Sequence, residues 1–138
     1  MPGNESCFVD TNIWLYAFTD DDARKKDVAQ ALIRESQLLV SEQVINEICV
    51  NLIKRANFPE TRICELIETF YQKYDVVELR KELLLSASQL RQEYALSYWD
   101  SLIIAAALAG DVTTLYSEDM QHGLAVRGRL RIVNPFTT

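Results

Sequence analysis

The sequence contains few of the residues that interrupt helices and strands. Among its 138 residues are only 4 glycines and 3 prolines, which argues against long flexible linkers. The composition is 49% hydrophobic and 25% charged, as in globular proteins and unlike disordered chains. A chain of this length can bury a sizeable core, so we expect one domain spanning residues 1–138.

Residues that bind zinc or form disulfide frameworks are equally scarce. The three cysteines, Cys7, Cys49 and Cys64, form no C-x-x-C pair, and His122 is the only histidine. A structural zinc site is therefore disfavoured. Because the cysteines lie in apolar runs, we expect them to be reduced core residues of a cytoplasmic protein. Residues 1–6 also lack the basic and apolar segments of a secretion signal.

Long hydrophobic runs and excess positive charge are absent too. The apolar run at residues 102–109 is far shorter than the ~20 residues of a membrane-spanning helix. The formal net charge of −6 argues against a general nucleic-acid coat protein. It does not exclude an enzyme that handles nucleic acid through bound metal ions and local basic patches.

The run at residues 102–109 predicts a helix around which the chain is organised. Leucine and alanine favour helix, and Gly110 is a natural stop. Because the run is apolar on every side, the helix should be enclosed by other elements. One charge, Asp100, lies at its beginning, and the Ser97-x-x-Asp100 spacing matches a capping box.

Strand and helix patterns alternate along the chain. Buried strands are expected at residues 7–9, 38–40, 76–77, 113–117 and 130–133, with helices at about 13–18, 23–35, 42–56, 83–90 and from the 102–109 run, and another starting with Pro59 in its first turn. This order predicts a three-layer α/β/α fold with a central, mostly parallel sheet of about four or five short strands flanked by helices. Ligands of such sheets bind beyond the carboxyl ends of the strands.

Four acidic residues fit a site at that edge. Asp10 and Asp119 follow strands, Glu47 flanks the apolar face of its helix, and Asp100 begins the core helix. Each has a simpler explanation: Asp10 and Asp100 as helix caps, Glu47 as a solvated side chain, Asp119 as part of a turn. If all four converge, their mutual repulsion requires a hard divalent cation, and oxygen ligands favour Mg²⁺ or Mn²⁺ over zinc.

These residues lie in four ordered motifs that resemble a known family. The motifs are Phe-Val-Asp10-Thr-Asn12, Val-Ile-Asn-Glu47, Trp-Asp100-Ser-Leu-Ile-Ile-Ala-Ala and Leu-Tyr-Ser117-Glu-Asp119. In order and spacing they resemble those of PIN-domain proteins, in particular the VapC-like toxins of type II toxin–antitoxin modules. The resemblance covers essentially the whole chain.

The resemblance implies a Mg²⁺- or Mn²⁺-dependent endoribonuclease. Asp10, Glu47, Asp100 and Asp119 would be its catalytic residues and metal ligands, supported by Thr11, Asn12, Ser117 and Glu118. A metal-activated water would attack the RNA phosphate and leave a 5′-phosphate product. The motif register favours Asp119, although the adjacent Glu118 could share its role. The resemblance also implies a cognate antitoxin that covers the acidic cleft, and a homodimer.

Residues that would contact RNA are less well defined by the sequence. Arg127, Arg129 and Arg131 form one candidate patch, and Lys54 with Arg55 another, although each could equally be ordinary solvated charge. Tyr98 and Trp99 could stack on a base, but an aromatic pair before a buried helix is more often core, and we expect core. His122 could assist proton transfer or be structural.

Two alternatives to a toxin stay open at this point. One is a PIN nuclease of RNA processing or DNA repair that has no antitoxin. The other is a catalytically silent PIN-like module that binds protein or RNA. The RNA target follows from none of these patterns.

Overall fold

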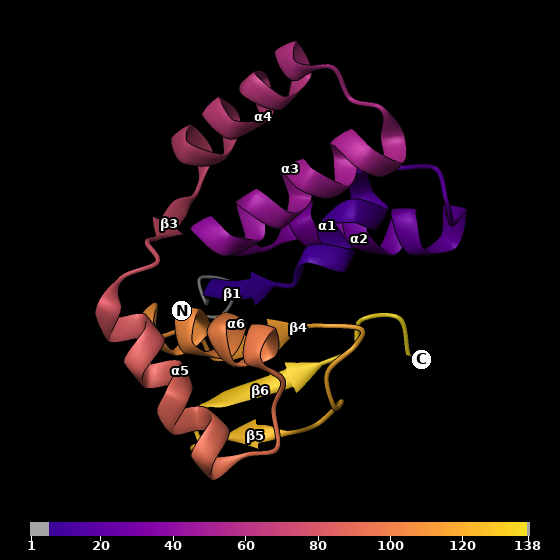
Figure 1. Cartoon of the computed structure of the whole chain (residues 1–138). Coiled ribbons are helices and arrows are strands. Elements are labelled where there is room, and N and C mark those ends of the chain that lie inside the picture. Colours follow the sequence, from indigo (N-terminus) through magenta and orange to yellow (C-terminus); the bar gives the residue numbers. More distant parts are fainter. Residues whose placement is uncertain (1–5, 138) are drawn as a thin grey trace.

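The computed structural model describes residues 6–137, and Figure 1 shows the arrangement of its elements. Residues 1–5, which belong to the segment expected not to be a secretion signal, lie outside the described part. In chain order the elements are β1 (Ser6–Val9), α1 (Thr11–Phe18), α2 (Ala23–Glu35), β2 (Gln37–Ser41), α3 (Glu42–Ala56), α4 (Glu60–Lys73), β3 (Asp75–Val77), α5 (Lys81–Glu93), α6 (Tyr98–Ala109), β4 (Thr114–Tyr116), β5 (Ala125–Val126) and β6 (Leu130–Val133).

The strands form one mixed sheet with the order β3-β2-β1-β4-β6-β5. All neighbouring strands are parallel except β5 and β6, which are antiparallel. The predicted mostly parallel sheet is confirmed, although it contains six strands rather than four or five. The additional strand is β5, whose two residues pair with β6 across a turn that contains Gly128 with positive φ.

Helices cover both faces of this sheet. The chain moves from β1 through β2 to β3 in one direction and then returns to β4 on the other side of β1. Because such crossovers are right-handed, α1–α4 lie on one face and α5–α6 on the other. The packing agrees, since α1 contacts α2 and α3, whereas α5 packs along α6 (Figure 1). The expected three-layer arrangement is therefore present.

Helix α6 is enclosed, as its sequence predicts. Every residue from Ser101 to Leu108 is buried. Burial of its leucine and isoleucine side chains contributes about 1.5–3 kcal/mol for each large side chain removed from water. At its end a Cβ on Gly110 would lie 1.9 Å from Leu39 Cδ2, so only glycine fits there without a shift of the Leu39 side chain.

Three expectations about the core are wrong. Cys7 and Cys49 are buried, but Cys64 is exposed. Helix α4 buries Ile63 and Phe70, and Cys64 is exposed because it follows Ile63 and points about 100° away from it around the helix. All three cysteines are free. Tyr98 and Trp99 are also not core, because they are 49% and 62% exposed.

Two smaller observations concern helix ends and helix lengths. Pro59 is the residue before the first turn of α4 rather than part of that turn. Among residues 6–137, the structure contains no helix whose length and apolar content would let it cross a membrane.

Candidate functional site

A cleft of about 190 Å³ lies at the carboxyl edge of the sheet, where β1 and β4 end. All four carboxylates singled out in the sequence line this cleft. Its lining residues are Asp10, Thr11, Asn12, Gln43, Glu47, Asn51, Trp99, Asp100, Ile103 and Asp119. They come from the ends of two strands and from α1, α3 and α6, so the topology brings together residues that are far apart in the sequence.

Asp10 is both a helix cap and a cleft residue. Its Oδ1 accepts a hydrogen bond from the Thr11 backbone N–H at 2.7 Å and so caps α1. Its Oδ2 accepts one from the Ser117 hydroxyl at 2.9 Å. The Ser117 oxygen in turn accepts the Met120 N–H at 3.2 Å, which connects β1 to the loop after β4. The two interpretations of Asp10 therefore coexist.

Asp10 is also a costly residue to ionise. Burial raises its pKa from 3.8 to about 6, and the negative charges of Asp100 and Glu47 add to the rise. The hydrogen bonds from Thr11 and Ser117 act in the opposite direction but do not offset the burial. A buried carboxylate beside other carboxylates is the arrangement that a bound cation would stabilise.

Glu47 and Asp119 are held by the first turn of α1. The Thr11 hydroxyl donates to Glu47 Oε1 at 2.7 Å, and the Asn12 side-chain amide donates to Asp119 Oδ2. Asn51, one turn beyond Glu47, donates to the Glu47 backbone carbonyl at 2.8 Å. Thr11 and Asn12 thus orient one carboxylate on each side of Asp10.

Asp100 occupies the first turn of α6, but the cap of this helix is Ser97. The Ser97 hydroxyl oxygen accepts the Asp100 backbone N–H at 3.1 Å. The Asp100 carboxylate lines the cleft, where the positive end of the helix dipole favours a negative charge. The capping interaction uses the Asp100 backbone, so its side chain is available for another role.

Glu118 lies outside the cleft. It forms an ion pair with Lys25 and accepts a hydrogen bond from the Tyr16 hydroxyl at 2.7 Å. Burial acts to raise the pKa of Glu118, but the hydrogen bonds from Lys25 and Tyr16 outweigh it and leave the pKa below its ordinary value. Of the adjacent pair, only Asp119 lines the cleft, as the motif register favoured.

The cleft presents oxygen donors of the kind that a divalent cation needs. Within residues 6–137, no three His, Cys, Asp or Glu side chains lie close enough together to form a ready-made metal site. The chemistry of the donors nevertheless fits Mg²⁺ or Mn²⁺, because the charged groups that line the cleft are all carboxylates. The unfavourable ionisation of Asp10 supports the same fit.

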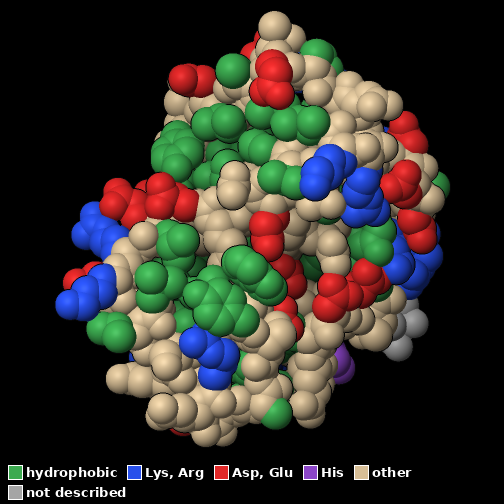
Figure 2. Space-filling view, viewed as in Figure 1, with side chains coloured by type: hydrophobic (Ala, Val, Ile, Leu, Met, Phe, Trp, Pro, Cys, Tyr) green, Lys and Arg blue, Asp and Glu red, His purple; other side chains and the backbone are tan. Residues whose placement is uncertain are grey.

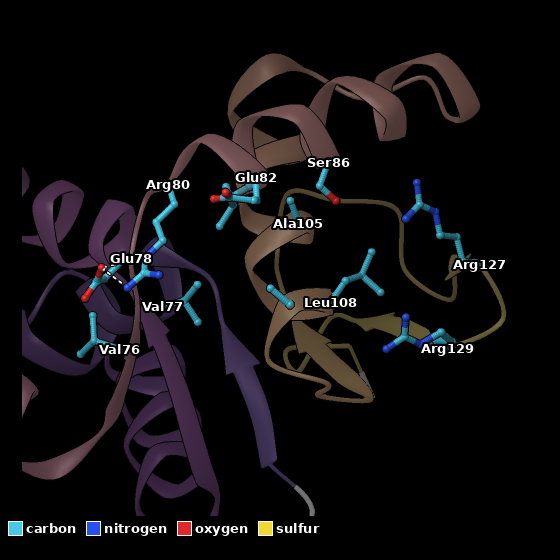
Figure 3. Close-up of a pocket in the computed structure, with 12 residues that line it drawn as sticks. Val76, Val77, Glu78, Arg80, Glu82, Ser86, Ala105, Leu108, Arg127 and Arg129 are labelled. Atoms are coloured by element: carbon cyan, nitrogen blue, oxygen red, sulfur yellow. Dashed lines mark hydrogen bonds and ion pairs between the residues drawn. The ribbon is translucent and has the colours of Figure 1, made fainter.

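The arginines expected to contact RNA lie elsewhere. Arg127 and Arg129 line a second pocket, of about 480 Å³, beside the C-terminal half of α6 (Figure 3). Arg127 forms an ion pair with Glu93 and Arg129 one with Asp111. The carboxylate cleft lies at the opposite, N-terminal end of α6, so the fold does not bring these two arginines to it.

The other candidate residues also have structural partners. His122 Nδ1 accepts the Asn134 N–H at 3.0 Å, which matches the structural alternative for this histidine. Arg55 donates to Asn51 Oδ1 at 3.4 Å, so it lies next to the cleft without lining it. Tyr98 lies beneath the Arg91 guanidinium, and only its neighbour Trp99 reaches the cleft.

Gln43 is a cleft residue that the sequence patterns did not single out. A signal was available, because Gln43, Glu47 and Asn51 follow each other at four-residue spacing and therefore lie on one face of α3. The amide and carboxylate side chains on this face contrast with the buried apolar face of the same helix.

Residues 7–125 match the PIN domain family. The chain belongs to this family. The four carboxylates that line the cleft are thus the acidic residues of the chain's PIN-like motifs. A comparison with curated proteins finds no significant match.

Solved structures of the same fold include a toxin and a toxin–antitoxin complex. A toxin–antitoxin complex from Klebsiella pneumoniae has a TM-score of 0.68 at 19% identity, covering 96% of this chain and 99% of that one. VapC20 of Mycobacterium tuberculosis, a sarcin-ricin loop cleaving toxin, has a TM-score of 0.67 at 19% identity. The match covers 82% of this chain and 89% of that one. FitAcB from Neisseria gonorrhoeae has a TM-score of 0.65 at 15% identity, and the match covers 96% of this chain and 99% of that one. At these identities the likeness establishes the PIN fold.

Proposed function

We propose that this PIN domain is a Mg²⁺- or Mn²⁺-dependent endoribonuclease that hydrolyses RNA phosphodiester bonds. The observation that carries the proposal is the convergence of Asp10, Glu47, Asp100 and Asp119 on one cleft. A surface site for solvation would not bury Asp10 to the extent that its pKa rises to about 6. The sarcin-ricin loop cleavage named for VapC20 is an RNA cleavage on the same fold and supports this substrate class.

Each carboxylate has a defined part in this proposal. Asp10, Glu47, Asp100 and Asp119 would hold the cation, while Thr11, Asn12 and Ser117 keep three of them oriented through hydrogen bonds. A divalent cation bound there supplies Lewis-acid stabilisation of the phosphate and lowers the pKa of water. The chain's own residues position the carboxylates and exclude part of the solvent around Asp10. Water, rather than the RNA 2′-hydroxyl, is then the nucleophile.

We also propose that the chain is the toxin of a two-protein module. The structural relatives include toxin–antitoxin complexes, which supports an antitoxin as partner. A groove of about 650 Å³ between α1, α2 and α4 offers a surface for part of it. Its walls combine apolar residues such as Phe18, Phe58 and Leu66 with the charged Arg34, Arg62 and Glu65. Such a toxin would act on RNA in the cytoplasm.

A homodimer is the remaining part of the proposal. Leu79, Leu84 and Leu85 are 48%, 42% and 55% exposed, and they lie at or near the start of α5. Clustered exposed leucines are typical of surfaces that contact another chain. Sedimentation of the purified protein tests this point: a single monomer species at high concentration would contradict it.

Cleavage by purified protein tests the proposed activity. The chain, freed of any co-purified partner, is incubated with RNA in Mn²⁺, with and without a chelator, and the 5′ ends of the products are mapped. We expect cleavage only without chelator and 5′-phosphate products. RNA that stays intact under both conditions would favour a silent PIN-like module, and activity without any partner gene nearby would favour a processing nuclease.

A further inference from the structure

Trp99 is an exposed aromatic side chain in a mostly polar cleft. It is 62% exposed and lines the cleft directly beside Asp100. Figure 2 shows hydrophobic side chains gathered over the beginning of α6, next to a recessed group of acidic side chains. Leaving an indole in water is unfavourable, so its position at the cleft indicates a surface that binds a planar group.

The ring of Trp99 is held by a short chain of contacts between α5 and α6. Tyr98 meets it edge-on, with ring centroids 5.2 Å apart and an interplanar angle of 82°. The Arg91 guanidinium lies 4.6 Å from the Tyr98 centroid and donates to the Ser101 hydroxyl at 2.6 Å. Ser101 is fully buried and donates to the Tyr98 backbone carbonyl at 2.6 Å. These contacts anchor Tyr98, the ring against which Trp99 rests, between α5 and α6.

The side chain of Trp99 is 62% exposed, so part of its ring surface is open to solvent. Tyr98 is its only aromatic neighbour within residues 6–137, and no described cation lies over it. Stacking between an aromatic side chain and a nucleobase needs an open ring face and tolerates any base. In a duplex both faces of each base are already stacked on neighbouring bases, so only an unpaired or splayed base can use the indole.

We propose that Trp99 is the stacking platform for an unpaired base next to the scissile phosphate. This inference rests on the proposed nuclease function. Trp99 and Asp100 are consecutive on α6, so a phosphate held at the carboxylates places its flanking base within reach of the indole. Trp99 acts here by positioning the substrate.

Abasic substrates test the proposal through cleavage. Single-stranded oligonucleotides carry one abasic position at each site around a mapped cut, and kcat/KM is measured in Mn²⁺ for wild type, Trp99→Ala and Trp99→Phe. We expect Trp99→Ala to lower kcat/KM on the intact strand by about 5- to 150-fold, with a smaller loss for Trp99→Phe. At one abasic position Trp99→Ala should have no further effect. Tyr71→Ala, an exposed aromatic on α4 that is 51% exposed, should stay within about twofold.

Tryptophan fluorescence gives a second measurement that does not depend on cleavage. The chain has two tryptophans, and Trp14 is buried, so the difference between wild type and Trp99→Phe isolates the signal of Trp99. Non-cleavable single-stranded RNA added in Mg²⁺ should quench this signal, whereas a duplex of the same sequence should not. Such quenching, combined with no cleavage of ordinary RNA by wild type, would overturn the nuclease function and still support the stacking site.

Three results would overturn the inference. Trp99→Ala could keep wild-type kcat/KM on the intact strand. Its loss could be the same at every abasic position, accompanied by a change from dimer to monomer in sedimentation, which would make Trp99 part of a contact between two copies. Duplex RNA could quench Trp99 as strongly as single-stranded RNA.

Discussion

Replacing Asp10 with asparagine should stabilise the metal-free protein. Asparagine caps a helix about as well as aspartate, so its Oδ1 can keep the hydrogen bond from the Thr11 N–H. The Ser117 hydroxyl can accept from the new amide in place of donating to the carboxylate. What the substitution removes is the negative charge that burial, Asp100 and Glu47 disfavour.

The magnitude follows from the raised pKa of Asp10. One pKa unit corresponds to about 1.36 kcal/mol. A rise in the pKa of Asp10 from 3.8 to about 6 therefore means that the ionised carboxylate destabilises the folded protein by about 3 kcal/mol. Residual water in the cleft and relaxation of neighbouring side chains reduce this value. We therefore expect Asp10→Asn to raise the free energy of unfolding by about 1–3 kcal/mol at pH 7.5 in chelator.

The effect has a defined pH dependence. The folded protein binds the Asp10 proton more tightly than the unfolded chain, because its pKa is about 6 in the fold against 3.8 ordinarily. The stabilising contribution is complete below about pH 4 and is lost as pH rises through about 6. The difference between Asp10→Asn and wild type should therefore be near zero at pH 4 and largest above pH 7.

Urea unfolding in chelator across pH 4–7.5 measures this difference. Asp27→Asn serves as the matched control, because Asp27 is an exposed aspartate on α2 and its substitution should change stability by no more than about 0.5 kcal/mol. Parallel curves for wild type and Asp10→Asn across the whole range would refute the reasoning. A loss of stability in Asp10→Asn at pH 7.5 would do so as well.

Four further substitutions separate structural roles from the proposed chemistry. Asp100→Asn should abolish RNA cleavage without loss of stability in the metal-free protein. Ser97→Ala, which removes the cap of α6, should lower the free energy of unfolding in urea by about 1 kcal/mol and leave cleavage measurable. If Asp100→Asn cleaves as fast as wild type, Asp100 has a structural role in the helix and no role in cleavage. Ile104→Ala, at a fully buried position of α6, should cost about 2–5 kcal/mol, and a cost under 1 kcal/mol would contradict the enclosed helix. Tyr16→Phe removes the hydrogen bond to Glu118 and should cost about 1 kcal/mol, with unchanged thermal unfolding as the contrary result.

The sequence predicted those parts of the fold that local patterns determine. The eight-residue apolar run could only be an enclosed helix, and α6 is buried from Ser101 to Leu108. The alternation of strands and helices also predicted the mostly parallel sheet. Strand β5 was missed because two residues are too few to form a pattern, and its pairing depends on a turn that places Arg127 and Gly128 at positive φ.

Features that depend on tertiary partners were harder to predict. Arg127 and Arg129 form a basic patch in the sequence, but their partners Glu93 and Asp111 are 34 and 18 residues away. Nothing in the local sequence specifies these ion pairs. The orientation of Trp99 was likewise hidden, because an apolar residue at the start of a buried helix can face either the core or the cleft.

The candidate site was predicted better than its surroundings. The rule that parallel strands end at one edge was sufficient to bring Asp10 and Asp119 together, and the helix positions of Glu47 and Asp100 completed the set. The motif register favoured Asp119 over Glu118, but the contacts of Glu118 with Lys25 and Tyr16 follow from no spacing rule.

The most direct test of the central claim is the rate of RNA cleavage in Mn²⁺ by four single variants, each with one cleft carboxylate replaced by its amide. The variants are Asp10→Asn, Glu47→Gln, Asp100→Asn and Asp119→Asn, with Asp27→Asn as the control. If the four carboxylates form one metal-dependent nuclease site, each of the four variants loses cleavage while the control cleaves as wild type does. Cleavage that persists in these four variants would contradict the account.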